Sequence, residues 1–357
     1  MPAAPARLTA ANAPLWDGDS YRDTGYTYCL DQAEVWEVMD AVAAAQRCVR
    51  VRDLVFNPGI GARDFPLTRL SRVLAELAAH VSEGRGFALL RGLPIDGLDE
   101  AGCAVLMRGL ASYLGTPATQ SRDGHLIRHV RATGAALGDT RVRGHQTGER
   151  LWFHTDGADA VILLCLRAAE AGGQSRLASA AAVHNKMLDE DASLVRQLYR
   201  PHHFHMAGGN AAGTPPTFIA PIFTLHAGRF SVRYIRHTLL ETPKVTGVPL
   251  DASSLAAFDA LERAADALSL DMTLRPGDAQ IVNNHTVLHS RTAYSDPDDA
   301  QQARHLLRCW VMFPQRQRVW MSQLDHDLSH GWMPDDVARR LARTWAPPAP
   351  PSHPVRA

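Results

Sequence analysis

The second half of the chain contains a series of short apolar runs separated by glycine, proline or aspartate. Short runs with turn signals between them are typical of a β-sandwich or barrel, because each strand turns back after crossing its sheet. This series constrains the fold more than any other feature, and it predicts a mainly β architecture. The expected strands cover residues 125–130, 151–155, 160–166, 218–225, 230–235, 271–274, 279–282 and 306–313.

Apolar residues at helical spacing precede and interrupt this series. The apolar segment Phe87-Ala88-Leu89-Leu90 lies among the early helices and predicts a buried strand. We find no internal repeat and no clear linker, so we expect residues 1–357 to form a single domain. Its core is expected at about 84–313, its N-terminal helical region at about 31–83, and a proline-rich disordered tail at 347–357. The expected helices cover about 31–48, 67–82, 98–114, 180–199 and 253–268.

The charges of the chain balance, with 37 basic and 37 acidic residues. This balance argues against a surface for nucleic acid or an anionic membrane, which would require a basic excess. The five cysteines are scattered and form no Cys-x-x-Cys pair, which indicates reduced thiols in a cytoplasmic protein. No apolar run approaches the roughly 18 residues of a membrane span. The composition therefore predicts no nucleic-acid or membrane partner, and it leaves a homo-oligomer open.

The segment Leu151-Trp152-Phe153-His154-Thr155-Asp156 places an imidazole and a carboxylate two residues apart. On a strand, residues i and i+2 point to the same face, so His154 and Asp156 would converge while Thr155 faces away. A neutral imidazole and a carboxylate are two of the three ligands in the facial triad of non-haem Fe(II). A His-x-Asp pattern alone is more often not a metal site, so the interpretation depends on a third ligand.

Two later histidines could supply that ligand. The stretch from Arg275 to Thr292 reads as a turn, a short apolar strand, and then His285 and His289. Composition does not choose between the two histidines. A single histidine in such a segment is more often a polar loop residue.

Two arginines lie in the apolar stretch from 304 to 313. If this stretch is a strand, Arg304 and Arg308 share one face with Leu306, Trp310 and Met312. Burying a guanidinium without an anion costs several kcal/mol, so each arginine requires a partner. The partner could be the carboxylate of a ligand or an internal aspartate or glutamate.

In this order, the three segments resemble the taurine dioxygenase / γ-butyrobetaine hydroxylase (TauD/TfdA-like) family of Fe(II)- and 2-oxoglutarate-dependent oxygenases. That family has His-x-Asp, a long insert, a distal histidine and then an arginine, as do His154-Thr155-Asp156, His289 and Arg304 here. The segment from Asn283 to Arg291 is similar to the family's Asp-Asn-x-x-Val-Leu-His-x-Arg. This similarity identifies His289, rather than His285, as the third ligand. The resemblance extends from about 84 to 313.

The resemblance implies a double-stranded β-helix, or jelly roll, with flanking helices. It implies that His154, Asp156 and His289 hold Fe(II) and that Arg304 binds the distal carboxylate of 2-oxoglutarate. Ser175 lies where the family commonly has a threonine after Gly-Gly, so its hydroxyl is expected to contact 2-oxoglutarate as well. Arg308 is expected to face the substrate.

The implied reaction uses O2 and 2-oxoglutarate, oxidises an unactivated C–H bond of a small, anionic substrate, and gives succinate and CO2. Hydroxylation is the expected outcome, and Asp156 argues against halogenation, because halogenases of this superfamily lack the carboxylate. One alternative is a zinc-dependent hydrolase with the same ligands, which leaves Arg304 without a role. The other is a non-catalytic jelly-roll protein that binds a ligand and forms no succinate.

Overall fold

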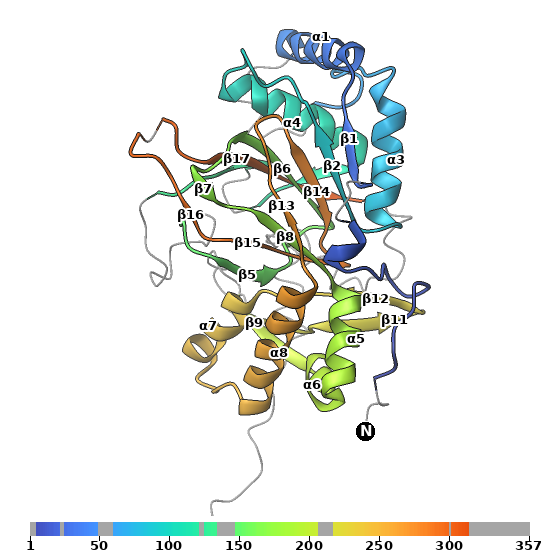
Figure 1. Ribbon diagram of the computed structural model, residues 1–357, viewed down its shortest axis with the longest axis vertical. Coiled ribbons are helices and arrows are strands. Elements are labelled where there is room, and N and C mark those ends of the chain that lie inside the picture. The colour runs from blue at the N-terminus through green and yellow to red at the C-terminus, as the bar shows by residue number, and fades with distance from the viewer. Residues whose placement is uncertain are drawn as a thin grey trace, which may run out of the picture.

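The computed structural model describes residues 5–21, 25–48, 60–120, 125–133, 147–205, 217–299 and 301–313. Two β-sheets lie in the middle of the molecule, with one group of helices above them and a second group below (Figure 1). The predicted tail at 347–357 lies outside the described residues. Among the described helices, none combines the length and the apolar character needed to cross a membrane.

The larger sheet has the order β1-β2-β14-β6-β17-β3, and β4 also pairs with β17. The pair β1·β2 is parallel, whereas the other pairs are antiparallel. Its central strands consist almost entirely of buried residues, because helices cover one face and the smaller sheet covers the other. The strands are β1 (Thr27–Cys29), β2 (Phe87–Arg91), β3 (Thr116–Ala118), β4 (Ile127–Val130), β6 (Ala160–Arg167), β14 (Ala279–Asn283) and β17 (His305–Met312).

The smaller sheet has the order β13-β8-β15-β5 and supplies the other wall of the sandwich. Its strands are β13 (Leu270–Met272), β8 (Ser175–Ser179), β15 (Val287–Arg291) and β5 (Leu151–His154). Three further two-stranded pairs lie outside the two sheets: β7 (Ala171–Gly172) with β16 (Tyr294–Ser295), β9 (Pro201–His205) with β10 (Thr217–Pro221), and β11 (Phe223–His226) with β12 (Arg229–Val232).

The alternation along β17 divides the core into two layers, as its sequence predicts. Leu306 and Trp310 pack into the layer between the two sheets. Leu307 and Cys309 point the other way, into the layer beneath the N-terminal helices. Arg308 therefore faces the interior of the sandwich, close to the smaller sheet.

Three helices cover the outer face of the larger sheet, namely α1 (Gln32–Cys48), α3 (Leu70–Ser82) and α4 (Glu100–Leu114). All three were expected from apolar spacing. Asp31 caps α1, since its carboxylate accepts the backbone N–H of Glu34 at 2.8 Å while Glu34 accepts that of Asp31. The side chain of Asp99 caps α4 in the same way, through the N–H of Gly102.

The insert between the two histidine-bearing strands forms the second helical group, α5 (Ala180–Glu190), α6 (Ala192–Leu198), α7 (Arg236–Thr246) and α8 (Ala252–Leu268). The prediction of one helix over 180–199 was wrong. Asp191 leaves the helical conformation, with φ −158° and ψ 100°, and its carboxylate caps α6. The expected strand at 218–225 is two strands, β10 and β11, and α7 was not anticipated.

Candidate active site

The two histidines of interest are direct neighbours in the smaller sheet. His154 is the last residue of β5, and the antiparallel register of β5 and β15 pairs it with His289. Their ring centroids lie 4.2 Å apart. The sheet thus brings together two side chains that the whole insert separates in the sequence.

Asp156 reaches the same point by a different route from the one its sequence predicts. The strand ends at His154, so Asp156 lies in the loop that follows rather than on the strand face. Its backbone N–H donates to Oδ1 of Asn284 at 2.9 Å. The N–H of Thr155 donates to the carbonyl of Tyr234 at 2.8 Å. Two hydrogen bonds therefore fix the loop and turn the Asp156 carboxylate towards the histidines.

One ligand atom from each of His154, Asp156 and His289 lies within 4.8 Å of the other two. Nδ1 of His154 lies 2.8 Å from the carbonyl of Trp152, which can only accept, so Nδ1 carries the proton and Nε2 has a lone pair to offer. Nε2 of His289 and Oδ2 of Asp156 are buried and have no hydrogen-bond partner among the described residues. Buried polar atoms are costly without a partner, and a bound cation would satisfy all three.

The protonation states of these groups suit a metal ion. Burial, and after it the adjacent His154, lower the pKa of His289 to about 3. Burial also lowers the pKa of His154. Burial alone would raise the pKa of Asp156, but the charge of Arg308 and then the two imidazoles bring it down to about 2. Near neutral pH the site therefore holds two neutral imidazoles and a carboxylate, the forms that bind metals.

His285, the competing candidate, lies elsewhere. Its Nε2 lies 2.8 Å from Oδ1 of Asp159, which is fully buried. Oδ2 of Asp159 accepts the backbone N–H of Phe313. His285 is thus part of a buried structural pair, and the structure brings His289 rather than His285 to the cluster with His154.

Arg304 lies immediately before β17 and is buried. Its guanidinium lies 5.0 Å from the centre of the Tyr294 ring, and its Nη1 has no hydrogen-bond partner among the described residues. A cavity of about 240 Å³ opens at this side chain and is bordered by the turn at Gly172 and Gly173. A buried cation that lines a cavity is suited to bind an anionic ligand.

The two glycines of this turn are required by their surroundings. Both have positive φ values, 76° at Gly172 and 72° at Gly173. A Cβ at residue 172 would collide with the carbonyl of Ala293, and one at residue 173 would lie only 3.2 Å from Nε of Arg304. The Gly-Gly pair therefore keeps space beside Arg304.

Arg308 has partners inside the protein. Its Nη1 lies 3.3 Å from Oδ1 of Asp156, and its Nε donates to Oε1 of Gln120 at 2.7 Å. The guanidinium also lies 5.2 Å from the centre of the Trp310 ring. Of the two partners that the sequence left open, the structure shows an internal acid, and that acid belongs to the candidate metal site. A contact between Arg308 and the substrate stays a prediction.

Ser175 is buried at the start of β8, where its hydroxyl donates to Oε1 of Gln280 at 2.8 Å. The hydroxyl oxygen retains its capacity to accept, so the expected contact with 2-oxoglutarate also stays a prediction.

Sequence reasoning missed three residues that support the site: Asn284, Gln120 and Tyr294. Asn284 lies within the segment that resembles the family, and its position before His285 was an available signal. Gln120 holds Arg308 from the loop after β3, and nothing in its local sequence indicates this. The ring of Tyr294 lies between the guanidinium groups of Arg291 and Arg304, at 4.5 and 5.0 Å.

Two sequence relatives and one family model match most of the chain. The model described as "Taurine catabolism dioxygenase TauD, TfdA family" matches residues 50–310. The chain is 32% identical over 305 residues to FR-33289 synthase of Streptomyces rubellomurinus (strain ATCC 31215), which covers 83% of this chain and 88% of that protein. It is 27% identical over 346 residues to the taurine hydroxylase-like protein SAT17 of Stachybotrys chartarum (strain CBS 109288 / IBT 7711). This match covers 90% of this chain and 87% of that protein.

Solved structures of non-haem iron oxygenases share the fold. Asparagine oxygenase in complex with Fe(II), 2S,3S-3-hydroxyasparagine and succinate has a TM-score of 0.62 at 23% identity, covering 84% of this chain and 98% of that one. The oxygenase OrfP in complex with Fe and alpha-ketoglutaric acid has a TM-score of 0.60 at 18% identity, covering 86% and 99%. The prediction of a mainly β, jelly-roll core with flanking helices is thereby confirmed. The chain belongs to the TauD/TfdA family of Fe(II)- and 2-oxoglutarate-dependent dioxygenases.

Proposed function

We propose that this dioxygenase holds Fe(II) through His154, Asp156 and His289 and hydroxylates a C–H bond of a small, anionic substrate. The observation that carries the proposal is the convergence of three ligand atoms within 4.8 Å, together with Nε2 of His289 and Oδ2 of Asp156, which are buried without a partner among the described residues. Two imidazoles and one carboxylate form the facial set that leaves positions open for other ligands. The chemistry of the donor atoms therefore fits the metal of the family.

Bound Fe(II), together with O2 and 2-oxoglutarate, supplies the oxidising power for C–H cleavage, with succinate and CO2 as co-products. The residues of the chain hold and orient the reactants. Trp152 fixes the tautomer of His154 through its carbonyl, and Asn284 fixes the loop that bears Asp156. Arg308 contacts Oδ1 of Asp156, and its charge keeps that carboxylate ionised. Such outer contacts orient ligands and sustain metal affinity.

Arg304 is the proposed anchor for the distal carboxylate of 2-oxoglutarate. Support comes from its burial, its free Nη1 and the cavity that it lines beside Gly172 and Gly173. Ser175 is proposed as a second contact, with Gln280 orienting its hydroxyl. A buried guanidinium pairs best with a carboxylate in a two-pronged contact.

The names of related proteins support hydroxylation of a small substrate that carries an anionic group. Relatives are named for taurine and for uridine-5'-phosphate, which carry a sulfonate and a phosphate. Solved structures of the same fold contain hydroxylated asparagine and hydroxylated arginine, which carry a carboxylate. Arg308 is the proposed contact for the anionic group, in addition to its pairing with Asp156.

We also propose that the chain forms one oxygenase domain and works in the cytoplasm. The helices α1, α3 and α4 share a core with the larger sheet, which supports a single domain. All five cysteines are free thiols in the structure, which supports a reducing compartment.

The test is an anaerobic titration with Fe(II) and 2-oxoglutarate, followed by an aerobic screen of small sulfonates, phosphates and amino acids that measures succinate. Substrate-dependent succinate with consumption of O2 supports the proposal. Turnover without 2-oxoglutarate and O2 would instead indicate the zinc-hydrolase alternative. Binding of both ligands without succinate from any substrate would indicate a non-catalytic binding protein.

A further inference from the structure

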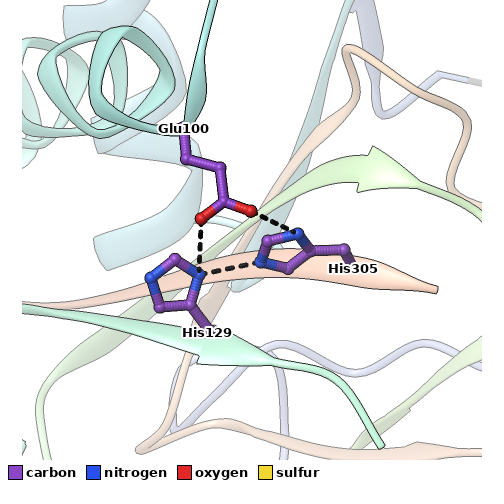
Figure 2. Close-up of side chains that lie close together, drawn as sticks. All are labelled: Glu100, His129 and His305. Atoms are coloured by element: carbon purple, nitrogen blue, oxygen red, sulfur yellow. Dashed lines mark hydrogen bonds and ion pairs between the residues drawn. The ribbon is translucent and has the colours of Figure 1, made fainter. Parts of the chain in front are cut away.

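Two histidines and one carboxylate other than those of the candidate active site form a second group (Figure 2). Glu100 begins α4, His129 lies on β4, and His305 begins β17. Nδ1 of His129 lies 2.8 Å from Nε2 of His305. Oε2 of Glu100 lies 4.0 Å from Nδ1 of His129, and its Oε1 lies 3.5 Å from Nδ1 of His305. We call this group the outer site.

The outer site is accessible from solvent, although one of its members is fully buried. The side chain of His305 has 0% exposure, whereas those of His129 and Glu100 are 44% and 54% exposed. A partly open group can bind an ion without unfolding and can keep water on the remaining positions. The three side chains come from three elements that the sheet and the helix hold in place, since β4 and β17 are paired.

Hydrogen bonding assigns the proton between the two imidazoles. Nη2 of Arg167 lies 3.2 Å from Nδ1 of His305 and can only donate. Nδ1 of His305 therefore accepts, so Nε2 carries the proton and donates it to Nδ1 of His129. This proton therefore lies between Nε2 of His305 and Nδ1 of His129, and a metal ion in its place could bind both nitrogen atoms.

We propose that Glu100, His129 and His305 form a second metal site, which binds a divalent ion of the zinc type. Zinc accepts imidazole nitrogens at about 2.0–2.1 Å and carboxylate oxygens at about 2.0–2.2 Å, commonly in a tetrahedral arrangement. Bonds of that length place tetrahedral ligand atoms roughly 3.3 Å apart. The distances of 2.8 and 4.0 Å in the outer site lie on either side of this value, so small side-chain rotations suffice.

The protons balance without loss from the protein. When the ion binds Nε2 of His305, that ring takes its other neutral form, with the proton on Nδ1. Glu100 then supplies one carboxylate oxygen to the ion, and the N–H at Nδ1 of His305 faces the place that the Arg167 guanidinium occupies in the ion-free site. Arg167 must then release Nδ1.

The charge states of the imidazoles agree with this geometry. Burial lowers the pKa of His305 to about 4, and burial likewise lowers that of His129. Both rings are therefore neutral near pH 7 and can bind an ion. The positive charges of Arg167 and Arg131 act on the same rings and oppose a cation. We therefore expect the affinity to be set by a competition between the ion and Arg167.

The test measures binding of Zn(II) to the full chain after the active-site ligands have been removed. The background variant carries His154→Ala and His289→Ala, so that a failure of the proposed Fe(II) site cannot affect the result. Equilibrium dialysis with metal analysis and a competing chelator gives the number of ions per chain and their affinity. The background variant is expected to bind one Zn(II) per chain.

Adding His129→Ala to the background should weaken that binding by about 100-fold or more, because even the loss of an outer-shell support costs about 10–100-fold. His129 is half exposed on a short strand, so this change should leave the fold intact, and circular dichroism checks it. The matched control is His226→Ala, which removes an exposed strand histidine outside the outer site. Background chain without bound Zn(II), or equal binding with and without His129, would overturn the proposal.

A second variant tests the competition with Arg167. Arg167→Gln in the same background removes the donor that holds Nδ1 of His305. It should tighten Zn(II) binding about two- to fivefold, the range expected for one solvent-screened charge. Weaker binding in this variant would contradict the assigned proton and therefore the proposed ligand set.

Discussion

The two groups of two histidines and one carboxylate differ in how their nitrogen atoms are engaged. In the active site, Nδ1 of His154 is bonded to a backbone carbonyl, and Nε2 of His289 has no partner among the described residues. In the outer site, the two imidazoles are bonded to each other and an arginine holds the remaining nitrogen of His305. The first group is arranged for an ion before the ion arrives, whereas the second must exchange hydrogen bonds to accept one.

The arginine near each group also acts differently. Arg308 contacts the carboxylate of Asp156 and keeps it ionised, so its charge assists the ligand that it touches. Arg167 contacts an imidazole, so its charge competes with a cation for the same ring. Both groups consist of two histidines and one carboxylate whose candidate ligand atoms lie within 4.8 Å of one another. The hydrogen-bond partners of these atoms distinguish the proposed Fe(II) site from the proposed outer site.

The largest expected effect comes from removing a ligand of the prepared site. His289→Ala should abolish Fe(II) binding and turnover, because the remaining two ligands do not hold the ion. His285→Ala is the control and should retain Fe(II), since its ring pairs with Asp159. Metal analysis of both purified variants and succinate production measure the difference. Loss of iron from His285→Ala alone would show that the distal ligand is misassigned.

Arg304→Ala should weaken the binding of 2-oxoglutarate by roughly thirtyfold or more. Removing one member of a buried charged pair costs about 2–5 kcal/mol, and 1.4 kcal/mol corresponds to about tenfold in affinity. Arg308→Ala should leave this affinity within a few-fold, because Arg308 contacts Asp156 rather than the cavity beside Gly173. Anaerobic titration in the presence of Fe(II) measures both variants. Equal losses would mean that the two arginines act as one cluster.

Asn284→Ala should lower the affinity for Fe(II) by about 10–100-fold without removing a ligand. Asn284 accepts the N–H of Asp156 and donates to the carbonyl of Ala158, so its loss frees the loop that positions the carboxylate. Chelator competition measures the affinity. An unchanged affinity would show that Thr155 and Tyr234 hold the loop without help.

The substitution Glu262→Gln is expected to have the smallest effect on activity but a clear effect on stability. This side chain lies behind β5 and accepts the N–H of Phe153 at 3.2 Å. Burial raises its pKa from 4.5 to about 7. Between these pH values the folded chain holds a proton that the unfolded chain has released, so the free energy of unfolding falls as pH rises, by about 3 kcal/mol in total.

Glu262→Gln should remove this contribution, because the amide does not titrate. Urea unfolding of both proteins between pH 4.5 and pH 8 would measure the difference in slope. If the free energy of unfolding depends on pH equally in both proteins, the source of the dependence lies elsewhere in the chain.

The central strands of the larger sheet were predictable because most of their residues are apolar, whereas the short edge strands β1 and β3 were not anticipated. β6, β14 and β17 are buried on both faces and appear in the sequence as mainly apolar runs. β8 and β15 escaped prediction because each is interrupted by polar residues. Two of these polar residues, Ser175 and His289, belong to the candidate site. Polar residues needed for function therefore interrupt the apolar pattern from which a strand is predicted.

The candidate ligands were likewise accessible from the sequence, but their supporting residues were not. The resemblance to the family indicated His154, Asp156 and His289, and the structure brings these three together. Gln120 acts through a hydrogen bond to Arg308, far away in the chain, and such a contact leaves no local pattern. The break at Asp191 was missed because apolar spacing continues through it, although aspartate commonly caps helices.

The pairing of His154 with His289 has a consequence for the order in which the chain folds. The two strands that carry them are joined only by a long-range closure around the insert, and such contacts form late and slowly. The three proposed ligands lie together only after that closure, so we expect a bound ion to have little effect on the rate of folding. We expect the bound ion to slow the separation of β5 from β15 in the folded protein. The iron-loaded enzyme should therefore unfold more slowly than the iron-free enzyme, while the two should fold at similar rates.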